Sequence, residues 1–188
     1  EQDEVEQGLI YDGFVVISDP LSPDVYESIR NCRSAGIEVK MLTGDNIRTA
    51  RAIANELHML DDDHIAVEAA DIEKLTDEEL KEALKKIQVI ARSTPLVKMR
   101  VVKLLKEQGN VVAVTGDGIN DAPAIKHADV GIAMGIAGTD VTKEASDMVL
   151  LDDSFSTIIK AVQWGRGIYE NFKRFIQFQL TVNVSSVV

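Results

Sequence analysis

Short apolar runs rich in β-branched residues alternate along this chain with longer amphipathic runs. A clear example is Val-Val-Ala-Val-Thr at residues 111–115, where four consecutive apolar side chains replace the strict apolar–polar alternation of a half-exposed strand. Such runs are typical of strands covered on both faces, and strands that alternate with helices build parallel sheets. The sequence therefore predicts an α/β fold, with a parallel sheet that carries helices on both faces.

The same pattern gives approximate limits for the individual elements. Strands are expected at 14–18, 38–42, 89–91, 111–115, 130–133 and 148–151. Helices are expected at 23–34, 46–57, 76–86, 96–107 and 122–127, and a final helix follows Ser154 and continues into an apolar tail. Thr76 and Glu79 have the spacing of a capping box at a helix start. The acidic stretch 61–79 is expected to be a solvated excursion from the sheet.

The charge balance bears on possible ligands. With 31 acidic and 20 basic residues the formal net charge is −11, which argues against nucleic acid as a partner because phosphate contacts need clustered Lys and Arg. The acidic residues can hold a cation such as Mg²⁺, or they can simply keep the protein soluble.

Three polar segments follow predicted strands, at the sheet edge where ligands bind in open α/β sheets. The first is Thr43-Gly44-Asp45. A hydroxyl and the N–H groups of a glycine turn at a helix N-terminus can cradle a phosphate. Taken alone, the tripeptide is better explained as a turn in which Asp45 caps the next helix.

The second segment holds two basic residues, Arg92 and Lys98. A lysine in the first helical turn after a strand can reach across the sheet edge as a point charge on phosphate. Arg92 could contact a second anionic or ribose group. Each of them, taken alone, is more often a solvated surface residue.

The third segment reads Thr-Gly-Asp-Gly-Ile-Asn-Asp-Ala-Pro at residues 115–123. Two carboxylates four residues apart on a glycine-opened loop can hold Mg²⁺, which prefers oxygen ligands and keeps several waters. Asp117 would be a direct ligand, and Asn120 and Asp121 would hold waters or orient the loop. A helix cap explains Asp121 but leaves the rest of the segment unexplained, so this segment favours a metal site.

These segments, in this order, resemble the haloacid dehalogenase superfamily, and within it the P-type ATPases. The resemblance rests on residues 115–134, 138–158 and 164–184 and covers nearly the whole chain, most weakly at 61–86. It implies a Rossmann-like haloacid dehalogenase fold without its N-terminal nucleophile strand. It further implies a phosphorylation domain at residues 1–160, followed at 161–188 by a stalk and a truncated fifth transmembrane helix.

The family's chemistry implies roles for individual residues. An aspartate in a D-K-T-G motif attacks the γ-phosphate of ATP and forms an aspartyl phosphate that drives ion transport, while Mg²⁺ and a lysine offset the charge of the transferring group. The matching positions here are Asp117 for Mg²⁺, Asn120 and Asp121 as its supporting pair, Thr43 and Gly44 for phosphate, Lys98 for phosphate, Arg92 near the nucleotide, and Asp45 and Asp19 around the nucleotide and the hinge.

Two features depart from the family pattern. No D-K-T-G occurs in the sequence, so the chain alone is expected neither to become phosphorylated nor to turn over ATP. In addition, Asp19-Pro20 is followed by Leu21-Ser22, where family members often have an arginine. A contact made by that arginine is therefore expected to be absent or supplied elsewhere.

The tail from Phe175 to Val188 contains no charged residue. It resembles the fifth transmembrane helix of plasma-membrane-type calcium pumps, which implies a membrane-bound parent protein with this domain on the cytoplasmic side. Asn183 matches an ion-lining asparagine, and Ser186 stands where reticulum-type calcium pumps have a glutamate; oxygen ligands suit Ca²⁺. A pump for Na⁺, K⁺, H⁺ or Mn²⁺ is also compatible with this tail. A separate alternative is that the tail is not a membrane segment but an amphipathic terminal helix packed on the domain.

Two other classes of function share part of this pattern. A soluble phosphatase of the same superfamily would need a D-x-D nucleophile motif near the N-terminus, but Asp12 is followed by Gly13-Phe14. A non-catalytic interaction domain would keep the fold without binding Mg²⁺ or phosphate.

Overall fold

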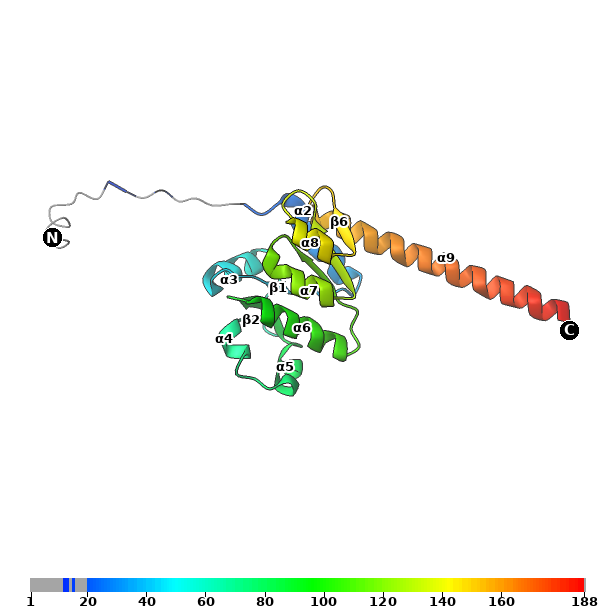
Figure 1. Cartoon of the computed structure of the whole chain (residues 1–188), viewed down its shortest axis with the longest axis horizontal. Helices are drawn as coiled ribbons and strands as arrows, with labels where there is room; N and C mark the ends of the chain where they lie inside the picture. The colour runs from blue at the N-terminus through cyan, green and yellow to red at the C-terminus, as the bar shows by residue number, and fades with distance from the viewer. Residues whose placement is uncertain (1–11, 14, 16–19, 188) are drawn as a thin grey trace.

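The computed structural model describes residues 12, 13, 15 and 20–187. They form a rounded α/β body from which one long helix projects (Figure 1). The strand expected at 14–18, apart from Val15, and the candidate residue Asp19 lie outside the described residues.

The first of two sheets has the order β1–β3–β2, with all neighbours parallel. β1 spans Met41–Leu42, β2 spans Ile65–Glu68 and β3 spans Ile87–Ala91. β3 is central and buried at every position, because helices cover both faces of this sheet. This part of the molecule confirms the predicted parallel α/β arrangement.

Two apolar layers hold the first sheet. On one face lie α4 (Ala69–Ile72), α5 (Asp77–Ala83) and α6 (Pro95–Glu107), whose cluster with β3 includes Ile72, Leu80, Leu84, Ile90, Val97, Val101 and Leu104. On the other face lie α2 (Pro23–Ser34) and α3 (Ile47–Glu56), with Ile29, Ala50, Ala54, Leu57, Met59 and Val89. Burial of this apolar surface is the main stabilising term for the body.

The second sheet has the order β4–β5–β6 and is also parallel. β4 spans Ala113–Gly116, β5 spans Val130–Met134 and β6 spans Met148–Leu150. The 3₁₀ turn η1 (Ile119–Asp121) and α7 (Ala122–His127) connect β4 to β5, and α8 (Asp140–Ala145) connects β5 to β6. The described strands thus divide between two sheets, and among them β1 and β4 each lie at an edge.

The strand β4 differs from its prediction as a fully buried strand. Ala113 and Thr115 are exposed, and Val111, predicted to begin the strand, is 86% exposed and lies before it. The apolar run predicts a strand covered on both faces, whereas β4 pairs, among the described strands, only with β5, and one of its faces is exposed.

The acidic stretch 61–79 was wrongly expected to be a solvated excursion. It contains β2, which pairs with β3, and α4, whose Ala69 and Ile72 are buried. Most apolar residues of this stretch are buried or half-buried, while most of its carboxylates remain exposed. The net acidity therefore concealed a strand and a helical turn.

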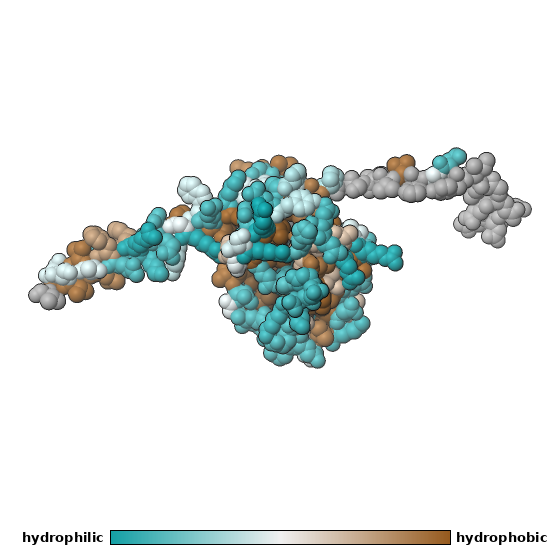
Figure 2. Space-filling view, turned by 180° about the vertical axis from the view of Figure 1, so that it is seen from behind, coloured by the Kyte–Doolittle hydropathy of each residue, from teal (hydrophilic) through white to brown (hydrophobic). Residues whose placement is uncertain are grey.

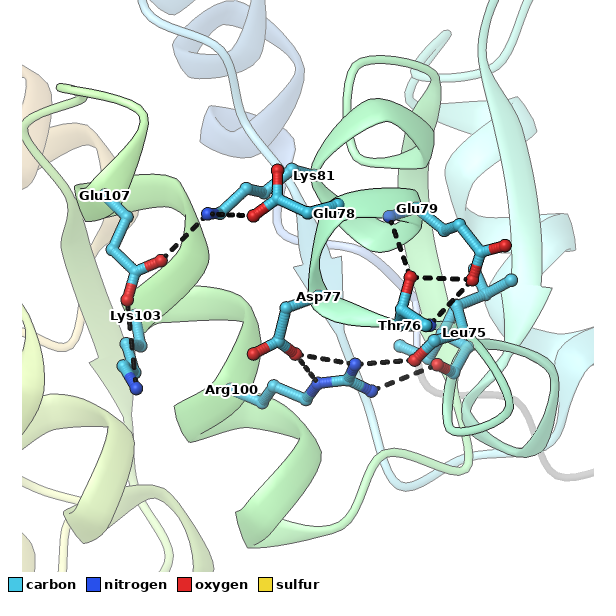
Figure 3. Close-up of polar contacts among 10 residues, drawn as sticks. Leu75, Thr76, Asp77, Glu78, Glu79, Lys81, Arg100, Lys103 and Glu107 are labelled. Carbon is cyan, nitrogen blue, oxygen red and sulfur yellow. Dashed lines mark hydrogen bonds and ion pairs between the residues drawn. The ribbon is translucent and has the colours of Figure 1, made fainter.

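A polar network fastens α5 to α6 (Figure 3). The Arg100 guanidinium donates to Asp77 Oδ1 at 2.8 Å and to the carbonyl oxygens of Leu75 at 2.7 Å and Ile72 at 3.2 Å. At the start of α5, Thr76 and Glu79 form the capping box that the sequence predicted. These contacts anchor the 69–83 segment to the helix that carries Lys98.

Arg100→Lys is expected to lower the free energy of unfolding by about 1–3 kcal/mol, because an ammonium cannot reproduce the forked donor geometry and leaves carbonyl oxygens without partners. Chemical denaturation of both proteins measures the change. Lys103→Ala is the control: Lys103 lies on the same helix, 66% exposed and 3.8 Å from Glu107, and should change stability by less than about 1 kcal/mol. Equal effects of the two substitutions would contradict the role given to Arg100.

The last helix, α9, spans Phe155–Val187. Its first turns pack against α2, where Ser154 Oγ donates to Asp24 at 2.7 Å and Arg166 donates to the Ala35 carbonyl oxygen at 2.8 Å. From Gln163 onward every described residue of α9 is exposed, and apolar side chains gather toward the free end of the helix (Figure 2). A terminal helix packed on the domain along its whole length is therefore excluded. None of the described helices has both the length and the apolar character needed to cross a membrane.

Candidate functional site

The loop after β1 is shaped by its own side chains. Thr43 Oγ1 donates to Asp45 Oδ2 at 2.9 Å and accepts from the Asp45 N–H at 3.1 Å. The cap of α3 is Asn46, whose Oδ1 accepts from Thr49 N–H at 3.0 Å. The alternative in which Asp45 caps the helix is therefore wrong, and Asp45 orients Thr43 beside the exposed Gly44.

The loops after β1 and β3 are joined through their backbones. The Ser93 N–H donates to the Thr43 carbonyl oxygen at 2.8 Å, and the Arg92 N–H donates to that of Asp45 at 2.9 Å. Arg92 has a φ of +54°, a left-handed conformation that is uncommon for residues other than glycine and clusters at functional sites. The arginine side chain is exposed at this position.

Lys98 lies in the first turns of α6, which begins at Pro95 and is capped by Thr94. Its Nζ is 2.5 Å from Asp121 Oδ1, and the two side chains are only 15% and 14% exposed. Asp121 Oδ2 accepts from the Gly118 N–H at 3.3 Å. Asp121 makes no side-chain cap on α7; its carboxylate joins the loop after β4 to the helix after β3.

Asp117 presents a different environment. Its side chain is exposed, and among the described residues its carboxylate accepts no hydrogen bond from protein groups. Its backbone carbonyl oxygen accepts from the Thr139 N–H at 3.0 Å and lies 3.3 Å from Thr142 Oγ1. Asn120 is exposed on the same loop. The loop is thus fixed by its backbone and leaves one carboxylate free.

Glycine is required where this loop begins. A Cβ on Gly116 would lie 2.4 Å from the Asp121 Cβ, so a side chain there would push Asp121 away from Lys98.

The structure therefore brings most predicted site residues into one chain of contacts. Thr43 bonds to the loop of Arg92 and Ser93, α6 begins two residues later, and its Lys98 meets Asp121 beside Gly118. Asn183 is not among them, because it lies in the last two turns of α9, the helix that projects from the body (Figure 1). Within residues 12, 13, 15 and 20–187, no three His, Cys, Asp or Glu side chains lie together as a metal site.

Three polar residues in or near these loops were not singled out by sequence reasoning. Thr142 is fully buried and contacts the Asp117–Gly118 backbone. The Asp153 carboxylate accepts from the N–H groups of Gly135, Ile136 and Ala137, and these bonds, that from Ala137 foremost, lower the pKa of Asp153. Ser93 Oγ is buried without a hydrogen-bond partner among the described residues. Only the i, i+3 spacing of Thr139 and Thr142 was visible in sequence, and it indicates no more than a helix cap.

Family models give the broader assignment. A model described as haloacid dehalogenase-like hydrolase matches residues 1–129, and a second model with the same description matches residues 98–162. The chain belongs to the haloacid dehalogenase-like hydrolases. The predicted superfamily is confirmed, and the two parallel-sheet units are the fold expected of it.

Relatives of this haloacid dehalogenase-like domain include plant calcium pumps. The chain is 55% identical over 183 residues to the plasma-membrane-type calcium-transporting ATPase 3 of Oryza sativa subsp. japonica, and 55% identical over 177 residues to the plasma-membrane-type calcium-transporting ATPase 2 of Arabidopsis thaliana. These alignments cover 97% and 94% of the chain. The chain spans 18% of the length of each relative.

Solved structures agree with these relatives. A zinc-transporting PIB-type ATPase in an E2.Pi state matches 83% of the chain with a TM-score of 0.64 and 31% identity, over 21% of its own chain. The catalytic domain of the CPx-ATPase CopB-B matches 77% of the chain with a TM-score of 0.58 and 26% identity, over 46% of its own chain. Both neighbours are P-type ATPases, as the sequence resemblance predicted.

Proposed function

We propose that this chain is the C-terminal part of the phosphorylation domain of a cation-transporting P-type ATPase, with Ca²⁺ as the transported ion. The parent protein would couple ATP hydrolysis, through an aspartyl phosphate, to ion transport. The observation that carries the proposal is the Lys98–Asp121 contact, which ties the loop after β4 to the helix after β3. The relatives of this chain, named as calcium-transporting ATPases, support the same conclusion.

The free carboxylate of Asp117 suits Mg²⁺, which binds through one or two carboxylates and retains several waters. Asn120 would contact those waters, and Asp121, held by Lys98 and Gly118, would keep the loop in place. When bound, Mg²⁺ would offset the charge of the phosphoryl oxygens. Lys98 would supply positive charge to the same group, and the N–H of Gly44 would donate to it. The Thr43 hydroxyl, which has one proton and donates it to Asp45 in this structure, would turn from Asp45 to donate to the phosphoryl group. Arg92 and Asp45 would lie toward the nucleotide of bound ATP.

The acceptor aspartate would come from another segment of the parent protein, since the sequence contains no D-K-T-G. Among the described strands, β1 and β4 each lie at an edge of their sheet, next to the loops of this site. The Ser93 hydroxyl, which is buried and has no hydrogen-bond partner within the described residues, lies on the loop after β3, where a further segment would supply its hydrogen bond. A parallel strand that carries the acceptor at its carboxyl end would pair with these edges and meet Lys98 and Asp117.

The transported ion would bind near the C-terminal end of α9. Asn183 would contribute its side-chain oxygen to a Ca²⁺ site in the parent protein, which suits the oxygen preference of that ion. The body of the domain would then lie on the cytoplasmic side of the membrane, where ATP is present.

A thermal-shift measurement with Mg²⁺ and orthovanadate, a phosphate mimic, tests the proposal. A ligand that binds only the folded state at ten times its dissociation constant stabilises by about 1.4 kcal/mol. For a chain of this length that corresponds to a rise of roughly 3–6 °C in melting temperature. The rise should need both ligands and should disappear in Asp117→Asn.

Asp62→Asn is the matched control, since it removes an exposed carboxylate outside the site and should leave the rise intact. No rise in the unaltered chain would favour a non-catalytic interaction domain. Phosphatase turnover that is lost in Asp117→Ala would favour a soluble phosphatase instead.

A further inference from the structure

Thr142 is a buried polar residue that the proposed chemistry does not yet use. It lies in the first turn of α8, and its side chain is 0% exposed. The N–H of Thr142 donates to Thr139 Oγ1 at 3.3 Å, and the two hydroxyl oxygens are 2.8 Å apart. The cap explains the side chain of Thr139, but it does not require a hydroxyl at 142.

The Thr142 hydroxyl reaches the loop after β4. Its oxygen is 3.0 Å from the Gly118 carbonyl oxygen and 3.3 Å from that of Asp117. A hydroxyl has one proton to donate and lone pairs to accept with. Thr142 can therefore accept the proton of Thr139 and share its own between these two carbonyl oxygens.

Both backbone polar groups of Gly118 are consequently hydrogen-bonded. Its N–H donates to Asp121 Oδ2 at 3.3 Å, and its carbonyl oxygen accepts from Thr142. The carbonyl oxygen of Asp117 is bonded in the same way by the Thr139 N–H at 3.0 Å. These hydrogen bonds fix the backbone of residues 117 and 118, and with it the position from which the Asp117 side chain extends.

We propose that Thr142 is a positioning residue for Asp117, whose buried hydroxyl holds the loop in the conformation that binds a divalent cation. The inference rests on the proposed function, since it assigns the metal to Asp117. Groups that orient metal ligands commonly change metal affinity by about 10–100-fold when they are removed. Without the hydroxyl, the Gly118 carbonyl oxygen would keep only the Asp121 N–H, which donates to it at 2.9 Å. The link from the loop to α8 through Thr142 would be lost, and the loop would relax.

Titration with Mn²⁺, followed by NMR of the isotope-labelled full chain in mild detergent, tests this inference. Mn²⁺ takes the same oxygen ligands as Mg²⁺, and its unpaired electrons broaden the amide signals near its site. In the unaltered chain we expect broadening centred on residues 117–121. Thr142→Val keeps the side-chain shape but removes the hydroxyl, and should weaken Mn²⁺ binding by about 10-fold. Thr142→Ser keeps the hydroxyl and should remain within about 2-fold of the unaltered chain.

A stability control separates positioning from folding. Ile72→Val shortens a buried side chain under the other sheet, and should lower the melting temperature without changing Mn²⁺ affinity. Unchanged affinity in Thr142→Val would overturn the role of Thr142 and leave the proposed function standing. A loss in Ile72→Val equal to that in Thr142→Val would also overturn it. No broadening at 117–121 in the unaltered chain would overturn the metal role of Asp117, and the inference with it.

Discussion

Gly138→Ala is expected to lower the free energy of unfolding by about 3 kcal/mol or more. Gly138 is buried, and a Cβ at this position would lie 1.9 Å from the Met134 carbonyl oxygen at the end of β5. The contact is with backbone, so no side-chain rotation relieves it, and overpacking a rigid site costs about 1–3 kcal/mol and sometimes more. The adjacent residue, Thr139, donates its N–H to the Asp117 carbonyl oxygen, so the displacement should also disturb the metal-binding loop.

Denaturant unfolding measures this loss, and Gly165→Ala supplies the matched control. Gly165 lies on α9, where an added Cβ would meet no atom within 4 Å, and alanine there should favour the helix by up to about 1 kcal/mol. If Gly138→Ala were as stable as the unaltered chain, the close approach of the 135–138 loop to β5 would be wrong.

Lys98→Met is expected to have the second large effect, both on stability and on chemistry. The substitution keeps an unbranched side chain but leaves the Asp121 carboxylate, 14% exposed, without its partner. Removing one member of a buried ion pair costs about 3–5 kcal/mol, so a loss of about 3 kcal/mol is expected for this mostly buried pair. The double variant Lys98→Met/Asp121→Asn removes both charges and should recover much of the loss, since the remaining groups are neutral.

The chemical effect of Lys98→Met is measurable in a longer protein that includes the acceptor aspartate. There, phosphoprotein formation from ATP should fall by a factor of about 100 or more, the size expected when one preorganised donor to the phosphoryl group is lost. The double variant should recover stability but not phosphorylation, which separates the two roles of the lysine. Full phosphorylation in Lys98→Met would contradict its assignment to the phosphoryl group.

The observed boundaries of helices and strands agree with the predicted ones where the local sequence signals were strong. The helices Pro23–Ser34 and Ala122–His127 have their predicted limits, and the predicted capping box begins α5. β2 and α4 were missed because each is only four residues long and lies in a stretch rich in carboxylates. The strand expected at 38–42 shortens to Met41–Leu42, since hydrogen bonding to β3 begins only at Met41.

Some residues of the candidate site were likewise predictable from local sequence, and others were not. Glycine turns and their order along the chain indicated Thr43, Lys98 and Asp117, because these patterns are local and match a known family. The partner of Asp121 was not predictable, since a helix cap and an ion pair use the same carboxylate and only the position of α6 decides between them. The sequence did not indicate that Thr142 contacts the Gly118 carbonyl oxygen or that the Ser93 hydroxyl is buried, because these environments are made by residues distant in the chain.

The sequence by itself determined the α/β class, the family and the polar segments that follow the strands, because periodicity and turn chemistry depend on neighbouring residues. Only the tertiary structure decided that the described strands form two sheets, that β4 lies at the edge of one of these sheets, and that Lys98 pairs with Asp121. These features depend on which surfaces come into contact when distant segments pack. An apolar run or a single charged residue can pack against several different partners, so the sequence alone does not select one.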